Sequence, residues 1–426
     1  MTSPPISLTP AERAMLAGDE GPALQLAMRL VLKAAEIMGA RALVPIGFAH
    51  LDACFYAGEA HVDFARFLLE NRARFAVPTW TNATVVSRSD PDLRPCAASP
   101  QIVKGAHLLR ELYEELGAAP TWTCAPYQLP DRPKRGDHIV AGESNAVTFY
   151  NSVIGARTNK YGDYLDVACA MIGKAPYAAL HTDQGRKAAL LFKLKHIDPA
   201  LLREQIFFHL LGHHVGRVAG RQNPAIEGLP ANAAEDDLRA VSAAVASSGG
   251  VDLWHGIGVT PEAPDLASVF ATGDTYDVTP ADLIAARDDL TSGRDGPLDM
   301  VALGTPHFSF AEFAELHRLL DGRRIKPGLV FYVSTSRFVR NLIEAEGWLA
   351  DFARAGITIV TDVCTYYSPA VRGARGRVMT NAAKWAYYAP GMLGVEVCFG
   401  SLGECVESAM RGEVWRDPAL RRMLEA

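Results

Sequence analysis

The segment DMVALGTPHFSFAEFAELHRLLDGRRIKPGLVFYVS, residues 299–334, contains two apolar runs separated by a stretch whose apolar side chains recur at helical spacing. Short apolar runs rich in β-branched residues predict buried strands. A second helical stretch and the run ITIVT follow. The predicted strands lie at 299–303, 328–334 and 357–361, with helices at 309–320 and at about 336–354. This βαβαβ order predicts a parallel sheet with right-handed crossovers.

Polar residues follow each of these predicted strands. They lie in the segments 304–307 (GTPH), 335–337 (TSR) and 362–364 (DVC). Ligands bind at the carboxyl edge of open parallel sheets, so these segments are candidates for a site.

The same alternation of short strands and amphipathic helices extends towards the N-terminus. Thr9, followed by Pro10 and Glu12, is typical of a capped helix start, and an apolar strand is expected at 42–46. Further helices are expected at 61–73 and 103–117. The fold class is therefore α/β. A chain of 426 residues predicts about three lobes, and the polar stretch 230–297 predicts a lobe boundary.

Composition excludes several classes of protein. The chain has 42 basic and 48 acidic residues, a net charge of −6, which argues against nucleic acid as the main partner. No apolar run approaches the ~20 residues that span a bilayer, and the N-terminus lacks the pattern of a signal peptide. The seven cysteines are odd in number and widely spread. We therefore expect a cytoplasmic protein with reduced thiols.

The stretch ESNAVTFYNSVIGARTN, residues 143–159, gathers polar side chains on a predicted helix and its exit. Asn and Ser are poor helix formers, so a polar strip that faces a pocket would explain them, as would a helix cap followed by a turn. Arg157 could clamp a carboxylate with two hydrogen bonds. The candidate residues of this stretch are Glu143, Ser144, Asn145, Ser152, Arg157 and Thr158.

Two cysteines stand in places typical of functional segments. Cys124 lies in the proline-rich, irregular stretch 119–142, and Cys364 follows the strand that ends near Asp362. Thiolates are ligands for iron, yet no CxxC pair is present, so buried inert thiols are the alternative. Cys398 and Cys405 lie seven residues apart in CFGSLGEC. The remaining cysteines are expected to be structural: Cys54, Cys96 and Cys169.

Single polar residues also lie near predicted strand ends. His50 and Asp52 follow the first strand, His307 follows the strand at 299–303, and Lys384 stands among aromatic residues in TNAAKWAYYAP. Each of these residues alone is more often a surface or capping residue. Together they lie near predicted strand ends, which makes them candidates for one site.

A histidine pair lies on another predicted helix. His209 and His213 have the i, i+4 spacing of metal ligands, but no HExxH glutamate accompanies them. We therefore expect solvated imidazoles at a helix end.

Several phrases, in this order along most of the chain, resemble the aconitase X family of the iron–sulfur hydro-lyase superfamily. They are AHLDACFYAGEA, TWTCAPYQLPDRPKRGDHIVAGESNAVTFYNSVIGARTNKYGD, DMVALGTPHFS, TDVCTYYSP and TNAAKWAYYAPGMLGVEVCFGSLGECVESA. The resemblance implies an aconitase-like catalytic part, with several α/β/α lobes around a central cleft that holds an iron centre. It also implies a small swivel domain that carries a serine base. A chain of 426 residues is expected to cover the catalytic part over 1–426 with no fused swivel domain, so that domain would be a separate subunit.

The resemblance implies dehydration of a hydroxy acid. Bacterial members convert cis-3-hydroxy-L-proline to Δ1-pyrroline-2-carboxylate, and archaeal members dehydrate mevalonate 5-phosphate. Thr305 stands where the archaeal pattern has a cysteine, and Ala382 stands where serine is frequent; both differences favour the bacterial type. The loss of one thiolate also favours a two-iron cluster or a mononuclear iron over a four-iron cluster.

The resemblance assigns roles to the candidate residues. Cys124, Cys364 and Cys398 are the expected iron ligands, with Cys405 as the weaker third. His50, Asp52, Glu143 and His307 are the expected catalytic residues. The expected substrate-binding residues are Ser144, Asn145, Ser152, Arg157, Thr158 and Lys384. A regulatory subunit that binds an iron–sulfur centre or a metabolite without catalysis is the alternative from another class.

Overall fold

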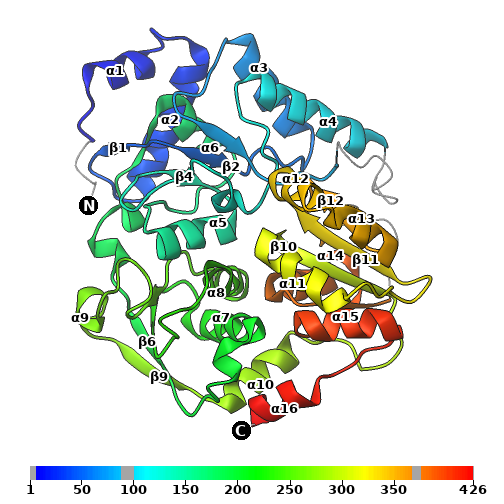
Figure 1. The fold of residues 1–426 in the computed structure, drawn as a ribbon. Helices are drawn as coiled ribbons and strands as arrows, with labels where there is room; N and C mark the ends of the chain where they lie inside the picture. The colour runs from blue at the N-terminus through cyan, green and yellow to red at the C-terminus, as the bar shows by residue number, and fades with distance from the viewer. Residues whose placement is uncertain (1–5, 88–99, 367–375, 426) are drawn as a thin grey trace.

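The computed structural model describes residues 6–87, 100–366 and 376–425, so Cys96 lies outside the described residues. Its strands form four sheets, and helices cover them (Figure 1). The fold is an α/β architecture with parallel sheets, as predicted.

The N-terminal part contains an antiparallel pair of strands and a parallel sheet in the order β3-β2-β4. The strands are β1 (Leu43–Pro45), β2 (Ala49–Leu51), β3 (Thr79–Thr81), β4 (Val140–Ala141) and β5 (Lys174–Pro176). The helices are α1 (Pro10–Ala17), α2 (Pro22–Ile37), α3 (Glu59–Glu70), α4 (Pro100–Glu115), α5 (Ser144–Phe149) and α6 (Leu165–Ile172). Thr9 and Glu12 form the predicted capping box of α1.

The helix expected from Ser144 to Gly155 forms, with one irregularity. Glu143 caps α5 by accepting a hydrogen bond from the backbone of Asn145. The last turn, Tyr150–Ile154, is a π-helix that ends at Gly155 in the left-handed conformation. π-turns of this kind often occur at functional sites.

The middle part is a parallel sheet in the order β8-β7-β6-β9. Its strands are β6 (Leu190–Leu194), β7 (Pro224–Glu227), β8 (His255–Gly256) and β9 (Asp274–Val278). Its helices are α7 (Gln205–Ala219), α8 (Glu235–Ser248), α9 (Leu266–Val269) and α10 (Pro280–Asp289). The stretch 230–297, where a lobe boundary is predicted, holds the elements from α8 to α10.

Helices α7 and α8 pack closely because α7 presents glycines to α8. A Cβ atom added at Gly212 would lie 2.7 Å from the carbonyl oxygen of Val241, and one at Gly216 would lie 3.0 Å from the Cα of Val245. Both distances are shorter than ordinary contacts, so the two backbones approach one another where only glycine fits.

The C-terminal part is the predicted parallel sheet, in the order β12-β11-β10-β13-β14. Its strands are β10 (Met300–Phe308), β11 (Val330–Thr335), β12 (Thr358–Thr361), β13 (Arg377–Thr380) and β14 (Glu396–Phe399). Its helices are α11 (Phe310–Leu320), α12 (Arg337–Ala345), α13 (Trp348–Ala355), α14 (Ala383–Leu393), α15 (Leu402–Arg411) and α16 (Pro418–Glu425). The single helix expected at 336–354 is two helices, because Gly347 at φ +77° separates them.

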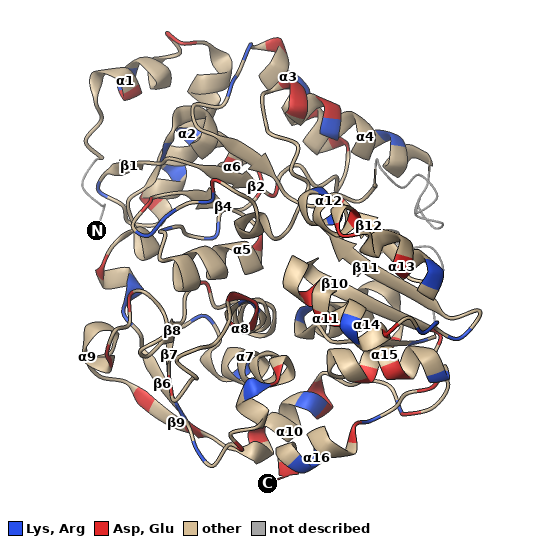
Figure 2. Ribbon diagram, in the orientation of Figure 1, with Lys and Arg blue, Asp and Glu red and all other residues tan. Residues whose placement is uncertain are grey.

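Charged residues of both signs are interspersed along the outer helices, such as α3 and α13 (Figure 2). Within the described residues, no helix combines the length and the apolar character that crossing a membrane would require.

Candidate active site and metal centre

Two thiols and an imidazole meet where the N-terminal and C-terminal parts face each other. The Sγ atoms of Cys124 and Cys364 lie 3.5 Å apart. With a ring nitrogen of His307 they form a group whose potential ligand atoms all lie within 4.8 Å of one another. All three residues are buried. Cys364 follows β12, as expected. His307 does not follow its strand but lies within β10, which extends further than the sequence indicates.

Hydrogen bonds fix the imidazole of this group. The Nδ1 atom of His307 lies 2.9 Å from Oγ1 of Thr123, and its Nε2 atom lies 3.0 Å from the carbonyl oxygen of Val363. The backbone N–H of His307 donates to Sγ of Cys124 at 3.3 Å. Each partner neighbours one of the two cysteines in sequence, so the three side chains form one connected unit.

The two thiols differ in acidity. Burial alone raises the pKa of the Cys124 thiol, but the Cys364 thiol that donates to its sulfur, together with His307 and Lys384, lowers that pKa to about 6. The same hydrogen bond and burial raise the pKa of Cys364. One thiolate therefore forms readily, and the thiolate is the form that binds metal.

A buried ion pair lies beside the thiols. Glu143, at the start of α5, pairs with the ammonium group of Lys384 from α14. The Nζ atom of Lys384 also lies 3.3 Å from Oγ of Ser144, and the amide of Asn145 donates to Glu143 at 2.9 Å. Although burial opposes the charge, Lys384 and Asn145 hold the pKa of Glu143 well below its ordinary value. Glu143 is therefore a carboxylate.

The pKa of Asp52 is shifted in the opposite direction to that of Glu143. The amide of Asn82 donates to Asp52 at 2.5 Å and to Glu143 at 3.3 Å, so one side chain joins the two acids. Burial and the neighbouring Glu143 carboxylate raise the pKa of Asp52 to about 7. Two adjacent carboxyl groups whose pKa values are pushed apart are typical of acid–base sites. Sequence reasoning missed Asn82, although it directly follows β3 and so stands at the same sheet edge.

His50 and Asn145 connect this network to the thiols. The Nε2 atom of His50 lies 3.0 Å from the carbonyl oxygen of Thr123, and burial lowers the pKa of His50 to about 4. The amide of Asn145 donates to the carbonyl oxygen of Cys124 at 3.0 Å and accepts from the hydroxyl of Tyr127 at 2.7 Å. No sequence pattern indicates Thr123 or Tyr127, because both act through local contacts of the irregular stretch.

Three predicted substrate-binding residues have partners elsewhere. Ser152 accepts from the backbone of Trp254 at 2.9 Å, and Thr158 accepts from the backbone of Ala141 at 3.2 Å. Arg157 pairs with Asp183 at 2.5 Å. It lines a separate cavity of about 300 Å³ with Arg135 and Arg186 among its other walls.

Cys398 does not join the two thiols. Its side chain packs in the hydrophobic cluster between the sheet and α11, α13 and α15, and its Sγ atom lies 3.7 Å from the carbonyl oxygen of Arg294. Its strand neighbours Val397 and Phe399 belong to the cluster that includes Cys124 and Cys364. Since successive strand residues point to opposite faces, the side chain of Cys398 and the thiols of Cys124 and Cys364 lie on different sides of the sheet. Cys398 therefore lies apart from the group of Cys124, His307 and Cys364, and Cys405 packs in the same hydrophobic cluster as Cys398.

The histidine pair on α7 also differs from its expectation. His209 and His213 are buried rather than solvated. The ring of His213 contacts Ser248 at 2.6 Å and Asp289 at 2.7 Å. Within the described residues, neither histidine belongs to a group of metal-ligand type.

The donor set of the central group fits a metal or a cluster. Two sulfur atoms and an imidazole suit iron, whereas a four-iron cluster with one open iron needs three thiolates. Two residues before His307, the buried hydroxyl of Thr305 has no hydrogen-bond partner within the described residues. The group therefore offers two sulfur atoms and one imidazole nitrogen to a metal.

Models of three family domains together match most of the chain. The models of the aconitase X first, second and third domains match residues 5–184, 188–288 and 298–411. The chain therefore belongs to the aconitase X family, and it is a hydro-lyase of that family.

Relatives and a solved structure agree with this assignment. The chain is 41% identical to the cis-3-hydroxy-L-proline dehydratase of Pseudomonas aeruginosa over 98% of this chain and 74% of that protein. It is 33% identical to the phosphomevalonate dehydratase large subunit of Thermococcus kodakarensis over 89% of this chain and 94% of that one. The crystal structure of Thermococcus kodakaraensis aconitase X in its holo-form matches with a TM-score of 0.85 at 31% identity, covering 95% of this chain and 100% of that one.

Proposed function

We propose that this protein dehydrates cis-3-hydroxy-L-proline to Δ1-pyrroline-2-carboxylate. The observation that carries the proposal is the pair of adjacent acids, the buried Glu143 and the half-buried Asp52, beside the thiols of Cys124 and Cys364. Glu143 is ionised, and the raised pKa of Asp52 keeps a proton available near neutral pH. The similarity to two dehydratases of this substrate supports the same conclusion.

The charge of the network favours an imino acid over mevalonate 5-phosphate, which is the alternative. Two carboxyl groups, Asp52 and Glu143, stand against one ammonium group, that of Lys384, so these side chains supply no excess of positive charge. A phosphate monoester carries nearly two negative charges and needs unpaired cations or donors. The ring ammonium of hydroxyproline instead complements the Glu143 carboxylate.

An iron centre bound by Cys124, Cys364 and His307, as a two-iron cluster or a mononuclear iron, would supply a Lewis acid for the substrate hydroxyl. The remaining chemistry falls to the protein. Glu143 would hold the ring ammonium. The ammonium of Lys384 has three N–H donors, of which Glu143 and Ser144 take two, so the third can bind the substrate carboxylate.

Asp52 would act as the general acid. A base on the partner removes the proton at the α-carbon, the bond to the C3 hydroxyl breaks, and the departing hydroxide takes the proton of Asp52 and leaves as water. The resulting enamine tautomerises to the cyclic imine. His50 and His307 are the other two expected catalytic residues that could donate a proton. The low pKa of His50 keeps it neutral, so Asp52 is the better donor.

The base is proposed to be a serine on a small swivel subunit. Relatives of this chain are large subunits by name, which supports a small partner. The Pseudomonas relative is matched over 74% of its length, which leaves room in that protein for a further domain.

The test is to co-express this chain with a small aconitase X subunit, purify the complex without oxygen, and assay both hydroxy acids while iron and sulfide are measured. Turnover of cis-3-hydroxy-L-proline with iron bound is expected. Turnover of mevalonate 5-phosphate alone would select the alternative. A complex that binds iron but turns over neither substrate would support a regulatory subunit.

A further inference from the structure

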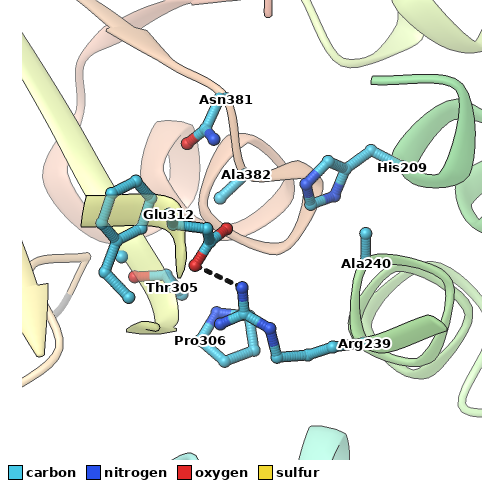
Figure 3. A pocket seen from close by; sticks show the side chains of 10 residues that line it. His209, Arg239, Ala240, Thr305, Pro306, Glu312, Asn381 and Ala382 are labelled. Carbon is cyan, nitrogen blue, oxygen red and sulfur yellow. Dashed lines mark ion pairs between the residues drawn. The ribbon is translucent and has the colours of Figure 1, made fainter. Parts of the chain in front are cut away.

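A small chamber with several polar side chains in its walls lies where α7, α8 and α11 meet β10 and the end of β13 (Figure 3). His209 comes from α7, Arg239 from α8, Thr305 from β10, and Asn381 follows β13. Figure 3 shows these side chains arranged around a common space, with Glu312 paired to Arg239 at one side. The chamber is distinct from the thiol group, although Arg239 donates to the carbonyl oxygen of His307 at 2.8 Å.

Four polar atoms in the walls of this chamber have no hydrogen-bond partner within the described residues: Nδ1 of His209, Oγ1 of Thr305, Oδ1 of Asn381 and Nε of Arg239. The Nε atom of Arg239 lies 3.2 Å from the carboxylate of Asp236, so in the described part of the chain the other three are the atoms without a polar partner. The exposed fractions of these residues are 6%, 2% and 4%, so bulk water does not satisfy them. A buried polar atom without a partner is costly, and three around one space point to a missing ligand.

The size of the chamber decides which ligand fits. It has room for the centre of a water molecule over about 10 Å³, which is the space that one water needs. A carboxylate or a phosphate has several heavy atoms and does not fit. The guanidinium group of Arg239 on the wall argues against a cation.

We propose that the chamber binds one ordered water molecule, which completes the hydrogen bonding of Thr305, Asn381 and His209. With this water, each of the three atoms has a hydrogen-bond partner. The Thr305 hydroxyl donates to the water, and the water donates to Oδ1 of Asn381 and to Nδ1 of His209. The imidazole can accept because burial lowers the pKa of His209 to about 3, so the ring is neutral.

The water has a positioning role that rests on the proposed function. Thr305 stands two residues before His307, and Asn381 stands three residues before Lys384. One water that joins both segments to α7 therefore fixes the strand ends that carry two residues of the candidate site. Thr305 and Asn381 are positioning residues in this sense and do not touch the substrate.

The first test is a high-resolution crystal structure of the protein. It should show one density peak at hydrogen-bonding distance from all three atoms. An empty chamber would overturn the proposal, as would a peak that contacts none of them.

The second test compares two isosteric variants, Thr305→Val and Thr361→Val. Both threonines are buried with hydroxyls unpartnered within the described residues, but Thr361 does not line the chamber. Thr305→Val should lose or shift the density peak and lower Tm by about 1–2 °C, because a buried water loses a donor. Thr361→Val should leave Tm unchanged or slightly raised. Equal Tm values for the two variants would overturn the water site.

The third test separates positioning from the water site. Thr305→Val should lower kcat several-fold with KM and iron content unchanged, and Thr361→Val should leave kcat unchanged. Loss of the density peak with normal kcat in Thr305→Val would keep the water site but overturn its positioning role. If both variants and the unmodified complex are inactive, the result would instead contradict the proposed function.

Discussion

The Sγ atoms of Cys124 and Cys364 lie 3.5 Å apart, although 240 residues separate them in the chain. One comes from an irregular segment of the N-terminal part and the other from the edge of the C-terminal sheet. Their contact therefore depends on the packing of two parts of the molecule, and their chemistry depends on both.

Replacement of either thiol should remove the metal. Cys364→Ser is expected to abolish iron binding and turnover, because the centre keeps only one thiolate. Cys398→Ser is the matched control, since that buried cysteine lies on the other side of the sheet. Iron content and turnover of both purified variants are the measurements. Loss of iron in Cys398→Ser with retention in Cys364→Ser would contradict the ligand assignment.

Removal of the Lys384 ammonium should destabilise the fold. Lys384→Met leaves the Glu143 carboxylate buried without its cation, which costs about 3–5 kcal/mol. The double variant Glu143→Gln/Lys384→Met should recover much of that loss, because no unpaired charge remains. Urea unfolding of the two variants is the check. Equal stabilities would show that the ion pair is not the source of the effect.

Asp52→Asn should lower kcat by about 10²–10⁴, the usual contribution of a general acid. The acid must be protonated to act and the pKa of Asp52 is about 7, so kcat should be high below pH 7 and fall as the pH rises through 7. In Asp52→Asn this alkaline limb should vanish. A kcat profile that keeps the limb would assign it to another group.

Acid should destabilise the protein through its buried histidines. Burial lowers the pKa of His181 to about 3, so the unfolded chain binds the proton more readily. Stability is therefore full above pH 6.5 and falls towards pH 3, by up to about 1.4 kcal/mol per pH unit for this group. His181→Gln should flatten the fall of Tm between pH 6.5 and 5, and the exposed His196→Asn should not. Unchanged slopes in both would remove His181 as a cause.

The sequence predicted the elements better than their contacts. The strands at 299–303, 328–334 and 357–361 were found because β-branched runs alternate with helical spacing, which is local information. Glu143 and Lys384 were selected separately, yet their pairing could not be predicted because it depends on how α5 and α14 pack.

Other site residues show the same limit. The sequence predicts Arg157 as a carboxylate clamp but not its pairing with Asp183, which lies 26 residues further along the chain. The face to which Cys398 points depends on the phase of β14, which a segment with two glycines close by does not specify in the sequence. His307 was expected after a strand, but β10 continues through it with a shift of register between Leu303 and Phe308.

The close approach of α7 and α8 has a mechanical consequence for the centre. Gly212 and Gly216 lie so close to the backbone of α8 that no side chain fits between the two helices. Arg239 lies on α8 two residues before Val241, which Gly212 contacts, and its guanidinium group donates to the carbonyl oxygen of His307. Alanine at Gly212 would push α8 and shift Arg239 relative to His307, so the middle part of the molecule acts on the geometry of the candidate site through the helix that carries Arg239.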